Sequence, residues 1–408
     1  MSRDNSAAEA PPGATGRKRV AIVTTIWTYL SHAQHIGDRF LVGYPLRGRW
    51  HRPAVDVVSL FVHQRPEGDQ SEQRAREFGF RVYPTIQEAL RCGGDRLAVD
   101  AVLIIAEHGE YPSNEKGQKL YPRYEFFQQV VEVFEKDGRS VPVFNDKHLS
   151  FSFAKAQKMV AASRRLKFPM LAGSSMPVTW RLPPLELPLE SAVEEALLVF
   201  SSSSLDAHGF HALEALQCMM ERRRGGETGV RAVQVLEGDA VWKAGEKGAW
   251  SQALLEAAIS RCDSPQGLTV LDGRTQDLVR NGELRRLAKN PAVFLLEYRD
   301  GLRAALLMLE GAVADIAFAA RLTGVPRIQS NQFLHTLTPN VTYSACLVAN
   351  IEELIETGRP PYPVERTLLV SGILESCLDS RFQNHRRLET PHLDVRYRAP
   401  QGSHFCRD

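Results

Sequence analysis

The stretch that decides the fold is VPVFNDKHLSFSFAKAQKMV, residues 141–160. Residues 141–144 form an apolar run typical of a strand, and residues 153–160 carry apolar side chains at helical spacing. The charged turn Asp146-Lys147-His148 stands between them. Because ligands of an open α/β sheet bind at the carboxyl ends of its strands, we predict that this turn carries chemistry. A lone turn lysine is more often only solvated, so the surrounding sequence has to decide.

Outward from this stretch, strands and helices alternate. This order predicts a Rossmann-like, doubly wound parallel sheet with right-handed crossovers. Strands are expected at 17–26, 54–64, 81–84, 97–112, 141–144 and 168–175, and helices at 27–44, 70–80, 85–94, 124–138 and 153–160.

The pattern changes after Pro177, where the Pro-rich connection RLPPLELPLE begins a different region. Two apolar runs within residues 291–311 surround Asp300-Gly301, a pair that favours a tight hairpin. We therefore expect a disordered tail at 1–16, a Rossmann-like nucleotide-binding-type domain at 17–175 and, at 176–408, an α+β domain built on a largely antiparallel sheet for substrate binding and oligomerisation.

Composition narrows the classes of function. The 408 residues carry a formal net charge of +2, which gives no reason to expect nucleic acid or an anionic membrane as a partner. No stretch reaches the roughly 18 apolar residues that would span a bilayer. The six cysteines are scattered and form no pair of zinc or redox spacing. We expect a cytoplasmic protein with mostly buried thiols.

The alternation of strands and helices, followed by SSSSLDAHGFHALEALQCM (201–219) and NIEELIETGRPPYPVERTLLVSGILESCLDS (350–380), resembles the Gfo/Idh/MocA family of glucose-fructose oxidoreductases and inositol dehydrogenases. The resemblance spans roughly residues 18 to 382. It implies an NAD- or NADP-dependent oxidoreductase that acts on a secondary alcohol of a sugar or cyclitol-like, polyhydroxylated substrate. It also implies a homo-oligomer, which an apolar face of the second sheet would favour.

Two family motifs align with this sequence. Asp146-Lys147-His148 stands where the family has a Glu-Lys-Pro turn, and residues 209–214 match the family's Gly-x-His-x-x-Asp, with Glu214 in place of Asp. The resemblance implies that Lys147 and His211 are the catalytic pair. The expected catalytic residues are therefore Lys147, His211, Asp146, His148 and Glu214.

The family's glycine-rich turn is missing. Thr24-Thr25-Ile26-Trp27-Thr28-Tyr29 follows the first strand, although glycines normally let backbone amides approach the pyrophosphate there. We expect these side chains, and the indole in particular, to crowd a dinucleotide. The second strand ends in His63-Gln64-Arg65 without the acidic residue that usually holds the ribose. The candidate cofactor contacts are Thr24, Thr25, Ile26, Arg65 and Glu107.

The connection AEHGEYPSNEKGQKLYPR, residues 106–123, is unusually rich in charge and aromatic hydroxyls. It predicts hydrogen bonds to a polyhydroxylated ligand, although a solvated surface loop explains the composition equally well. The candidate substrate contacts are His108, Tyr111, Tyr121, Arg123 and His208.

Two other functions stay open. His208, His211 and Glu214 recur every three residues, and with Glu107, His108, Glu110 and His148 they predict a divalent metal site. A metal-dependent, non-redox sugar lyase, hydratase or isomerase would use it. The third alternative is a catalytically inactive binding protein that keeps the fold.

Overall fold

The computed structural model describes residues 16–262, 277–336 and 341–407, so nearly all of the expected N-terminal tail lies outside the described residues. Its first half contains a six-stranded sheet with the order β5-β4-β1-β6-β7-β8. Every neighbouring pair in it is parallel, which confirms the predicted doubly wound sheet. Its strands are β1 (Lys18–Thr24), β4 (Val55–Val62), β5 (Arg81–Tyr83), β6 (Ala101–Ile105), β7 (Val143–Asp146) and β8 (Met170–Gly173).

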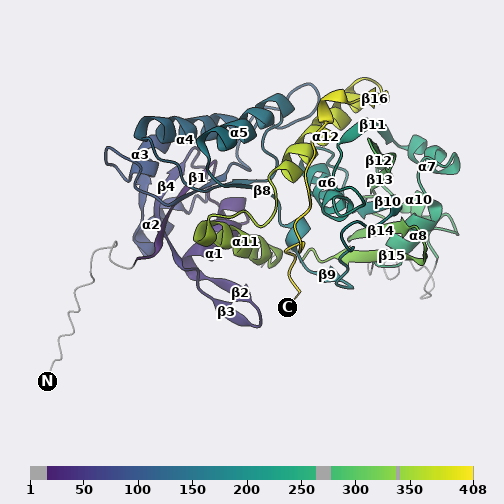
Figure 1. Cartoon of the computed structure of the whole chain (residues 1–408), viewed down its shortest axis with the longest axis horizontal. Helices are drawn as coiled ribbons and strands as arrows, with labels where there is room; N and C mark the ends of the chain where they lie inside the picture. The colour runs from purple at the N-terminus through teal and green to yellow at the C-terminus, as the bar shows by residue number, and fades with distance from the viewer. Residues whose placement is uncertain (1–15, 263–276, 337–340, 408) are drawn as a thin grey trace.

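Helices cover both faces of this sheet (Figure 1). One face is covered by α1 (His32–Val42), α2 (Ser71–Phe78) and α11 (Tyr343–Thr357), and the other by α3 (Ile86–Arg91), α4 (Arg123–Asp137) and α5 (Phe153–Leu166). The sequence did not predict that α11, which belongs to the C-terminal part of the chain, packs here against α1. Nor did it predict the two-stranded hairpin of β2 (Tyr44–Leu46) and β3 (Arg49–His51) that follows α1.

Local chemistry sets the helix ends. The side chain of Ser31 accepts the Gln34 N–H at the start of α1, and Thr85 caps α3 in the same way. Helix α3 ends before the predicted boundary at residue 94, because Cys92 takes the left-handed conformation with a φ of 51° and Gly93 follows it.

The second half is built on an eight-stranded sheet with the order β16-β11-β12-β13-β10-β14-β15-β9. Only β10 and β13 pair in parallel, so the sheet is largely antiparallel as predicted. The predicted hairpin around Gly301 joins β12 to β13. The strands are β9 (Arg181–Leu182), β10 (Val193–Phe200), β11 (Val230–Glu237), β12 (Ala292–Tyr298), β13 (Arg303–Met308), β14 (Ile316–Leu322), β15 (Val325–Phe333) and β16 (Leu388–Glu389).

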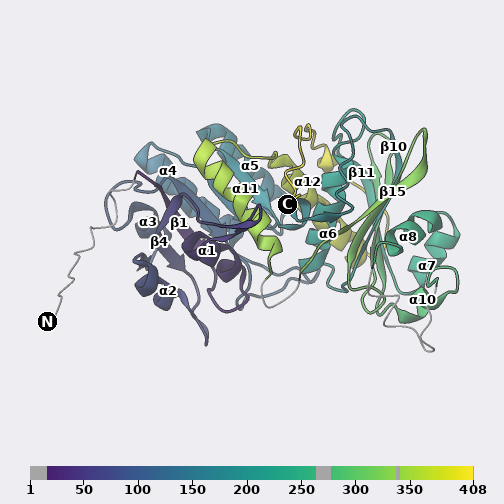
Figure 2. The same ribbon diagram turned by 90° about the horizontal axis from the view of Figure 1, so that it is seen from below.

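This second sheet is also covered on both faces (Figure 2). One layer consists of α6 (Ala207–Met220) and α12 (Glu365–Phe382), and the other of α7 (Asp239–Glu246), α8 (Gln252–Ile259) and α10 (Glu283–Leu287). Helices of the described residues therefore cover the apolar faces of this sheet, and the expected homo-oligomer stays a prediction. Two 3-10 turns, η1 (Met176–Val178) and η2 (Pro391–Leu393), complete the elements. Within the described ranges no helix is long and apolar enough to cross a membrane.

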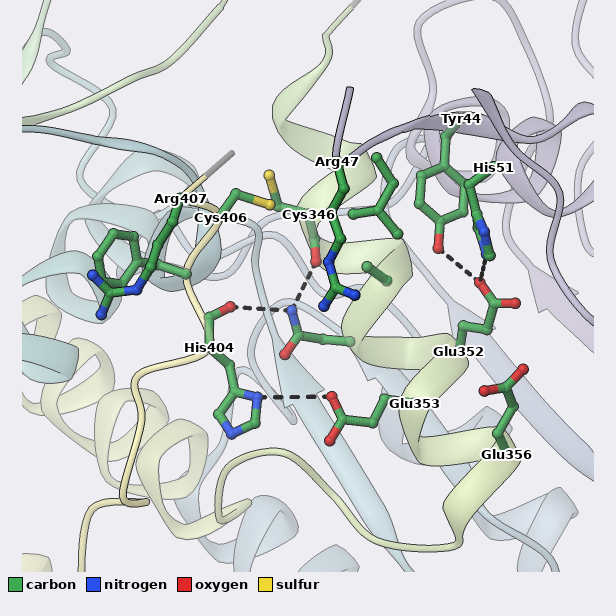
Figure 3. A pocket seen from close by; sticks show the side chains of 14 residues that line it. Tyr44, Arg47, His51, Cys346, Glu352, Glu353, Glu356, His404, Cys406 and Arg407 are labelled. Atoms are coloured by element: carbon green, nitrogen blue, oxygen red, sulfur yellow. Dashed lines mark hydrogen bonds and ion pairs between the residues drawn. The ribbon is translucent and has the colours of Figure 1, made fainter. Parts of the chain in front are cut away.

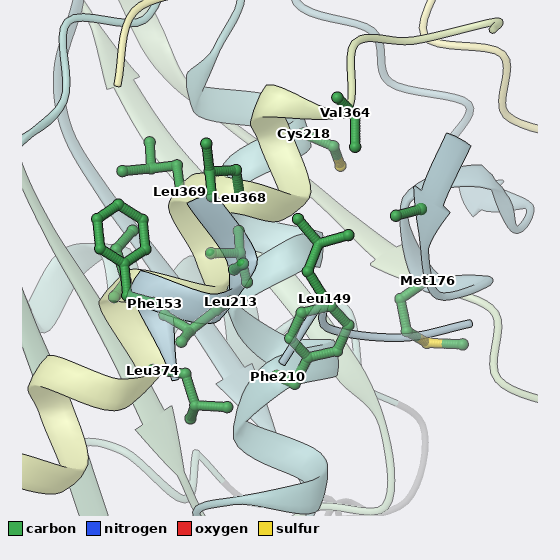
Figure 4. Close-up of a cluster of buried hydrophobic side chains, with 14 of the residues drawn as sticks. Leu149, Phe153, Met176, Phe210, Leu213, Cys218, Val364, Leu368, Leu369 and Leu374 are labelled. Carbon is green, nitrogen blue, oxygen red and sulfur yellow. The ribbon is translucent and has the colours of Figure 1, made fainter. Parts of the chain in front are cut away.

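One hydrophobic core continues from the first sheet to the second. Helices α6 and α12 lie between the two sheets, where Leu213 and Leu369 join Leu149 and Phe153 from the first half (Figure 4). Phe210 at the start of α6 belongs to this core and also touches the His148 ring, with centroids 5.4 Å apart. The packed core therefore fixes the start of α6 directly against the turn after β7.

Candidate functional site

The turn after β7 is buried and conformationally constrained. Asp146, Lys147 and His148 are each 5% exposed or less. Lys147 has a φ of 61°, and its N–H donates to the Gly173 carbonyl at 3.1 Å. A non-glycine residue in the left-handed region costs free energy and persists where the surroundings enforce it, often at a functional site. The tie to β8 holds the Lys147 backbone in this conformation.

Glu107, at the end of β6, holds the lysine side chain. Lys147 Nζ donates to Glu107 Oε1 at 2.9 Å, and Arg123 of α4 forms an ion pair with the other carboxylate oxygen. Burial alone would raise the pKa of Glu107, but Lys147 and then Arg123 outweigh it and hold that pKa well below the usual value. Glu107, which was predicted to contact a cofactor, is thus a carboxylate that positions two cations.

Arg123 also fixes the state of His148. Its Nη1 donates to His148 Nε2 at 3.1 Å, so this imidazole nitrogen carries no proton. Burial, together with the guanidinium, lowers the pKa of His148 well below its usual value. A neutral His148 therefore carries its proton on the other ring nitrogen, Nδ1, which is buried next to the Ser150 backbone.

Histidines from α1 and from the end of β6 complete the sheet edge. His32 Nδ1 lies 2.7 Å from Asp146 Oδ2, and the His32 backbone N–H is 3.5 Å from His108 Nδ1. Burial, followed by the charge of His32, lowers the pKa of His108 to about 4, and burial lowers that of His35 to about 3. His32 could not be singled out from the sequence, because a histidine near a helix start is more often a cap or a core residue.

Helix α6 brings the second predicted segment to the same place. Burial, then the nearby charge of Lys147, lowers the pKa of His211 well below its usual value, and its Nδ1 is buried without a partner in the described part of the chain. His208 Nδ1 instead lies 2.6 Å from Ser202 Oγ. The charge of Lys147 thus reaches His211, and the pairing of these two residues in catalysis stays a prediction.

A cavity of about 230 Å³ opens at this junction. Both halves of the chain line it, since it meets the ends of β6 and β7, the 106–123 connection and the start of α6. Lys119 belongs to the connection that was predicted to line a ligand, whereas Asp206 was not predicted; Asp206 Oδ2 accepts the Lys119 N–H at 2.9 Å and Oδ1 is buried without a partner in the described chain. The lining residues are Glu107, Ser113, Gly117, Lys119, Tyr121, Lys147, His148, Ser204, Asp206 and Ala207.

The remaining predicted site residues lie elsewhere. Glu214 points away from the cavity, where it accepts the Ser174 N–H at 2.6 Å and bonds the Thr367 hydroxyl at 3.1 Å. Burial raises the pKa of Glu214 to about 7. Because Glu214 and His208 have different partners, the predicted metal triad does not converge. In the described ranges, no group of three or more His, Cys, Asp or Glu residues is arranged to hold a metal ion.

The predicted cofactor contacts near β1 face inward. The hydroxyls of Thr24 and Thr25 donate to the carbonyls of Ile105 and Glu107, at 2.8 and 2.7 Å. Arg65 pairs with Glu72 at 2.8 Å on the surface. The Trp27 indole, expected to crowd a dinucleotide, is instead fully buried under α1. A Cβ on Gly37 would lie only 2.4 Å from this ring, so the glycine makes room for it.

A larger cavity of about 390 Å³ lies between α11, the β2–β3 hairpin and the C-terminal segment (Figure 3). Glu352 receives hydrogen bonds there from the Tyr44 hydroxyl and the Ala54 N–H, both at 2.7 Å. None of its lining residues lines the cavity beside Lys147. It is therefore separate from the candidate site.

A doubly wound parallel sheet joined to a largely antiparallel sheet, with charged residues where the strands of the first sheet end, defines a two-sheet fold whose first half is of the dinucleotide-binding type. No family model and no curated protein matches the sequence. Solved structures do match, and the resemblance to the Gfo/Idh/MocA family is confirmed at the level of the fold.

GenD2 from gentamicin A biosynthesis, solved in complex with NAD, has a TM-score of 0.55 at 15% identity over 93% of this chain and 99% of its own. The myo-inositol dehydrogenase of Lactobacillus casei, in complex with NAD(H) and myo-inositol, has a TM-score of 0.54 at 10% identity over 91% and 96%. A Gfo/Idh/MocA family oxidoreductase from Vibrio cholerae has 0.50 at 10% over 90% and 97%. At these identities the likeness establishes the fold.

Proposed function

We propose that the chain is an oxidoreductase that acts on a secondary alcohol of a sugar or cyclitol-like molecule, with NAD or NADP as its cofactor. One observation carries the proposal: Lys147, held by Glu107, lies within electrostatic reach of a neutral His211, beside a polar cavity lined by both halves of the fold. The likeness to solved dehydrogenases that bind NAD and, in one case, myo-inositol supports the reaction class.

The two residues have different roles in this proposal. His211 is neutral near pH 7, because burial and Lys147 lower its pKa, so it can accept the proton of a substrate hydroxyl. Lys147 donates to Glu107 and presents an ammonium that would bind the hydroxyl oxygen as the proton leaves. Asp206 and Tyr121, both at the cavity, would hydrogen-bond neighbouring hydroxyls.

The start of α1 does not fit the pyrophosphate of a dinucleotide in the arrangement described. The Thr28 N–H donates to Ser31 Oγ at 3.1 Å and the Leu30 N–H to Gln34 Oε1 at 3.2 Å, so donors that would face a phosphate are already used. The roles proposed for the residues of this chain are therefore limited to proton transfer and hydrogen bonding.

The decisive experiment combines cofactor binding with turnover. NADH and NADPH are titrated by fluorescence up to millimolar concentration, and NAD(P)⁺ reduction is followed with a panel of inositols and aldoses. We expect Lys147→Met and His211→Asn to lower kcat by about 10² to 10⁴, the usual range for removal of a general acid or base. Lys158→Met, which changes an exposed lysine on α5, is the control. Loss of activity in the control as well would contradict the assignment.

The occupied donors at the start of α1 also favour one alternative, a binding protein that keeps the fold without redox chemistry. This alternative expects a polyol to bind while neither dinucleotide does, and it expects Lys147→Met to change affinity only. Calorimetry of polyol binding to the unchanged chain and to Lys147→Met, with and without NAD⁺, distinguishes the two functions. A cytoplasmic location and a homo-oligomeric state remain part of the proposal; light scattering of the purified chain tests the second.

A further inference from the structure

A dinucleotide bound to a doubly wound sheet lies across the carboxyl ends of the first two strands of that sheet, which here are β1 and β4. Its pyrophosphate meets the helix that follows the first strand, and its adenosine ribose lies near the end of the second. In this chain the same edge contacts residues 107–111, which follow β6. We call these residues the 107–111 segment.

The segment is attached to the residues that follow β1. The Thr25 hydroxyl donates to the Glu107 carbonyl at 2.7 Å. Gly109 has a φ of 97°, and a Cβ added to it would lie 3.3 Å from Ile26 Cγ2 and 2.8 Å from Gln64 Oε1. A residue without a side chain is therefore needed for the segment to lie this close to the strand ends.

The attachment to the end of β4 is more extensive. Gln64 pairs with the Glu110 backbone in both directions, since its Oε1 accepts the Glu110 N–H and its Nε2 donates to the Glu110 carbonyl, each at 2.9 Å. His63 Nδ1 lies 2.7 Å from the Tyr111 hydroxyl, and the two rings are stacked with centroids 5.9 Å apart. His63 and Gln64 stand at the position that usually carries the ribose-binding carboxylate.

The cavity beside Lys147 is small compared with the space that a dinucleotide needs. The cavity beside Lys147 measures about 230 Å³, whereas sites for drug-sized ligands typically measure about 300–1,000 Å³, and a dinucleotide needs more than a substrate alone. None of the residues 24–31 or 63–65 lines this cavity. It can hold a single sugar ring beside Lys147, but it does not continue over β1 and β4.

We infer that the 107–111 segment occupies the adenosine half of the dinucleotide site, so that a dinucleotide binds only when the Gln64–Glu110 and His63–Tyr111 contacts break. The inference rests on the cofactor part of the proposed function. Its consequence is that Gln64 and Tyr111 oppose cofactor binding, although Tyr111 is a position that the sequence assigned to substrate.

The test compares the full-length chain with Gln64→Ala/Tyr111→Phe, which removes both polar contacts and keeps the Tyr111 ring. Gln73→Ala, an exposed glutamine on α2, is the control. Affinity for NADH is measured by fluorescence, and hydrogen exchange of residues 107–111 reports directly on release of the segment, because the Glu110 amide is protected by Gln64. Tyr111→Phe alone serves as a milder variant if the double variant folds poorly.

We expect the double variant to exchange faster at residues 107–111 and to bind NADH at least tenfold more tightly than the unchanged chain, with no change in the control. Equal NADH affinity in both proteins despite faster exchange overturns the inference and leaves the cofactor proposal standing. Faster exchange without NADH binding by either protein at millimolar concentration rejects the cofactor, and the inference falls with it. Unchanged exchange together with unchanged affinity also overturns the inference.

Discussion

Two buried clusters of acidic and basic side chains in this chain differ in how completely their polar atoms are hydrogen-bonded. The sheet-edge cluster comprises Glu107, Arg123, Asp146, Lys147, His148 and His211. The arginine network comprises Glu221, Arg223, Glu227, Arg366 and Tyr397.

In the arginine network, nearly every polar side-chain atom of the described ion pairs has a hydrogen-bond partner. Arg366 donates to both oxygens of Glu221 at 2.8 and 2.6 Å, and Arg223 binds Glu227 at 2.8 Å. One polar side-chain atom of its described members, Arg366 Nη1, lacks a partner.

The sheet-edge cluster leaves more of its capacity unused. Arg123 Nε, Asp146 Oδ1 and His211 Nδ1 are buried without partners among the described residues, and the neighbouring cavity is lined by Lys147 and His148. Buried polar atoms are nearly always satisfied in folded proteins, so unsatisfied atoms beside a cavity support the proposal that this cluster binds a ligand. The comparison separates a network that holds the fold from one that we propose is available to a ligand.

Acid should first affect the buried histidines in and beside the sheet-edge cluster. The pKa values of His35 and His108 lie at about 3 and 4, and those of His148 and His211 are also lowered, so the unfolded chain binds more protons below pH 6.5. These groups stabilise the fold fully above pH 6.5, and their contribution is lost as the pH falls toward 4. We expect the free energy of unfolding to drop by on the order of 5 kcal/mol, since a change from 6.5 to 4 in one group corresponds to roughly 3 kcal/mol and the groups are not additive.

Urea titrations at pH 7.5, 6 and 5 measure this loss. His108→Asn should reduce the dependence on pH, whereas the same change at the exposed His392 should leave it as it is. A His108→Asn variant whose free energy of unfolding depends on pH as strongly as that of the unchanged chain would refute the expectation.

Breaking the arginine network should cost stability at every pH. Arg366→Met removes a fully buried guanidinium and leaves the Glu221 carboxylate without its main partner. Loss of one partner of a buried ion pair typically costs about 3–5 kcal/mol. Chemical denaturation measures the loss, and Arg366→Lys should recover only part of it because an ammonium cannot form the two-pronged contact. A variant as stable as the unchanged chain would mean that Glu221 finds another partner.

Glu214 should respond to pH in the opposite direction. Its pKa is raised to about 7 by burial, so its contribution to stability is fully present below the unfolded value of 4.5 and is lost as the pH rises through 7. We expect a loss of roughly 2–3 kcal/mol from this single group. Glu214→Gln should remove that alkaline part of the profile, measured as the difference in unfolding free energy between pH 5.5 and 8. An unchanged difference would show that Glu214 stays ionised.

The smallest effect is expected at the surface. Arg164 and Glu365 form an ion pair 2.5 Å long between α5 and α12, and the arginine side chain is 67% exposed. Surface pairs contribute about 0–1 kcal/mol because water and salt screen them. Arg164→Ala should therefore lower the melting temperature by no more than a degree or two, which calorimetry resolves. A loss as large as that of Arg366→Met would remove the distinction between buried and exposed pairs.

The first sheet and the hairpin around Gly301 could be predicted because their signals are local. Apolar runs of strand length and a turn dipeptide with a positive-φ residue identify these elements without any distant contact. The arginine network could not be predicted in this way. No local pattern places Arg222 and Arg223 in the interior, yet both are less than 5% exposed because their partners, Pro400 and Asp300, come from far along the chain.

The same distinction between local signals and distant contacts applies to the candidate site. The strand-end position of Lys147 could be predicted from the alternation of elements, and the family resemblance supplied His211. The pairing of His32 with Asp146 spans 114 residues, and no pattern in the sequence reports it. Glu214 was misplaced because spacing of three along a helix does not state which side chain turns toward the core.

Helix α11 has a further consequence for how the chain is made. Ala345, Val348 and Ile351 cover an apolar face of the first sheet, although they follow its last strand by more than 170 residues. During translation α1 and α2 can cover only their part of this face, and the part under α11 stays exposed until residue 355 has left the ribosome, so we expect the nascent parallel sheet to be prone to aggregation until then. A gene fragment that stops near residue 175 should for the same reason yield insoluble protein.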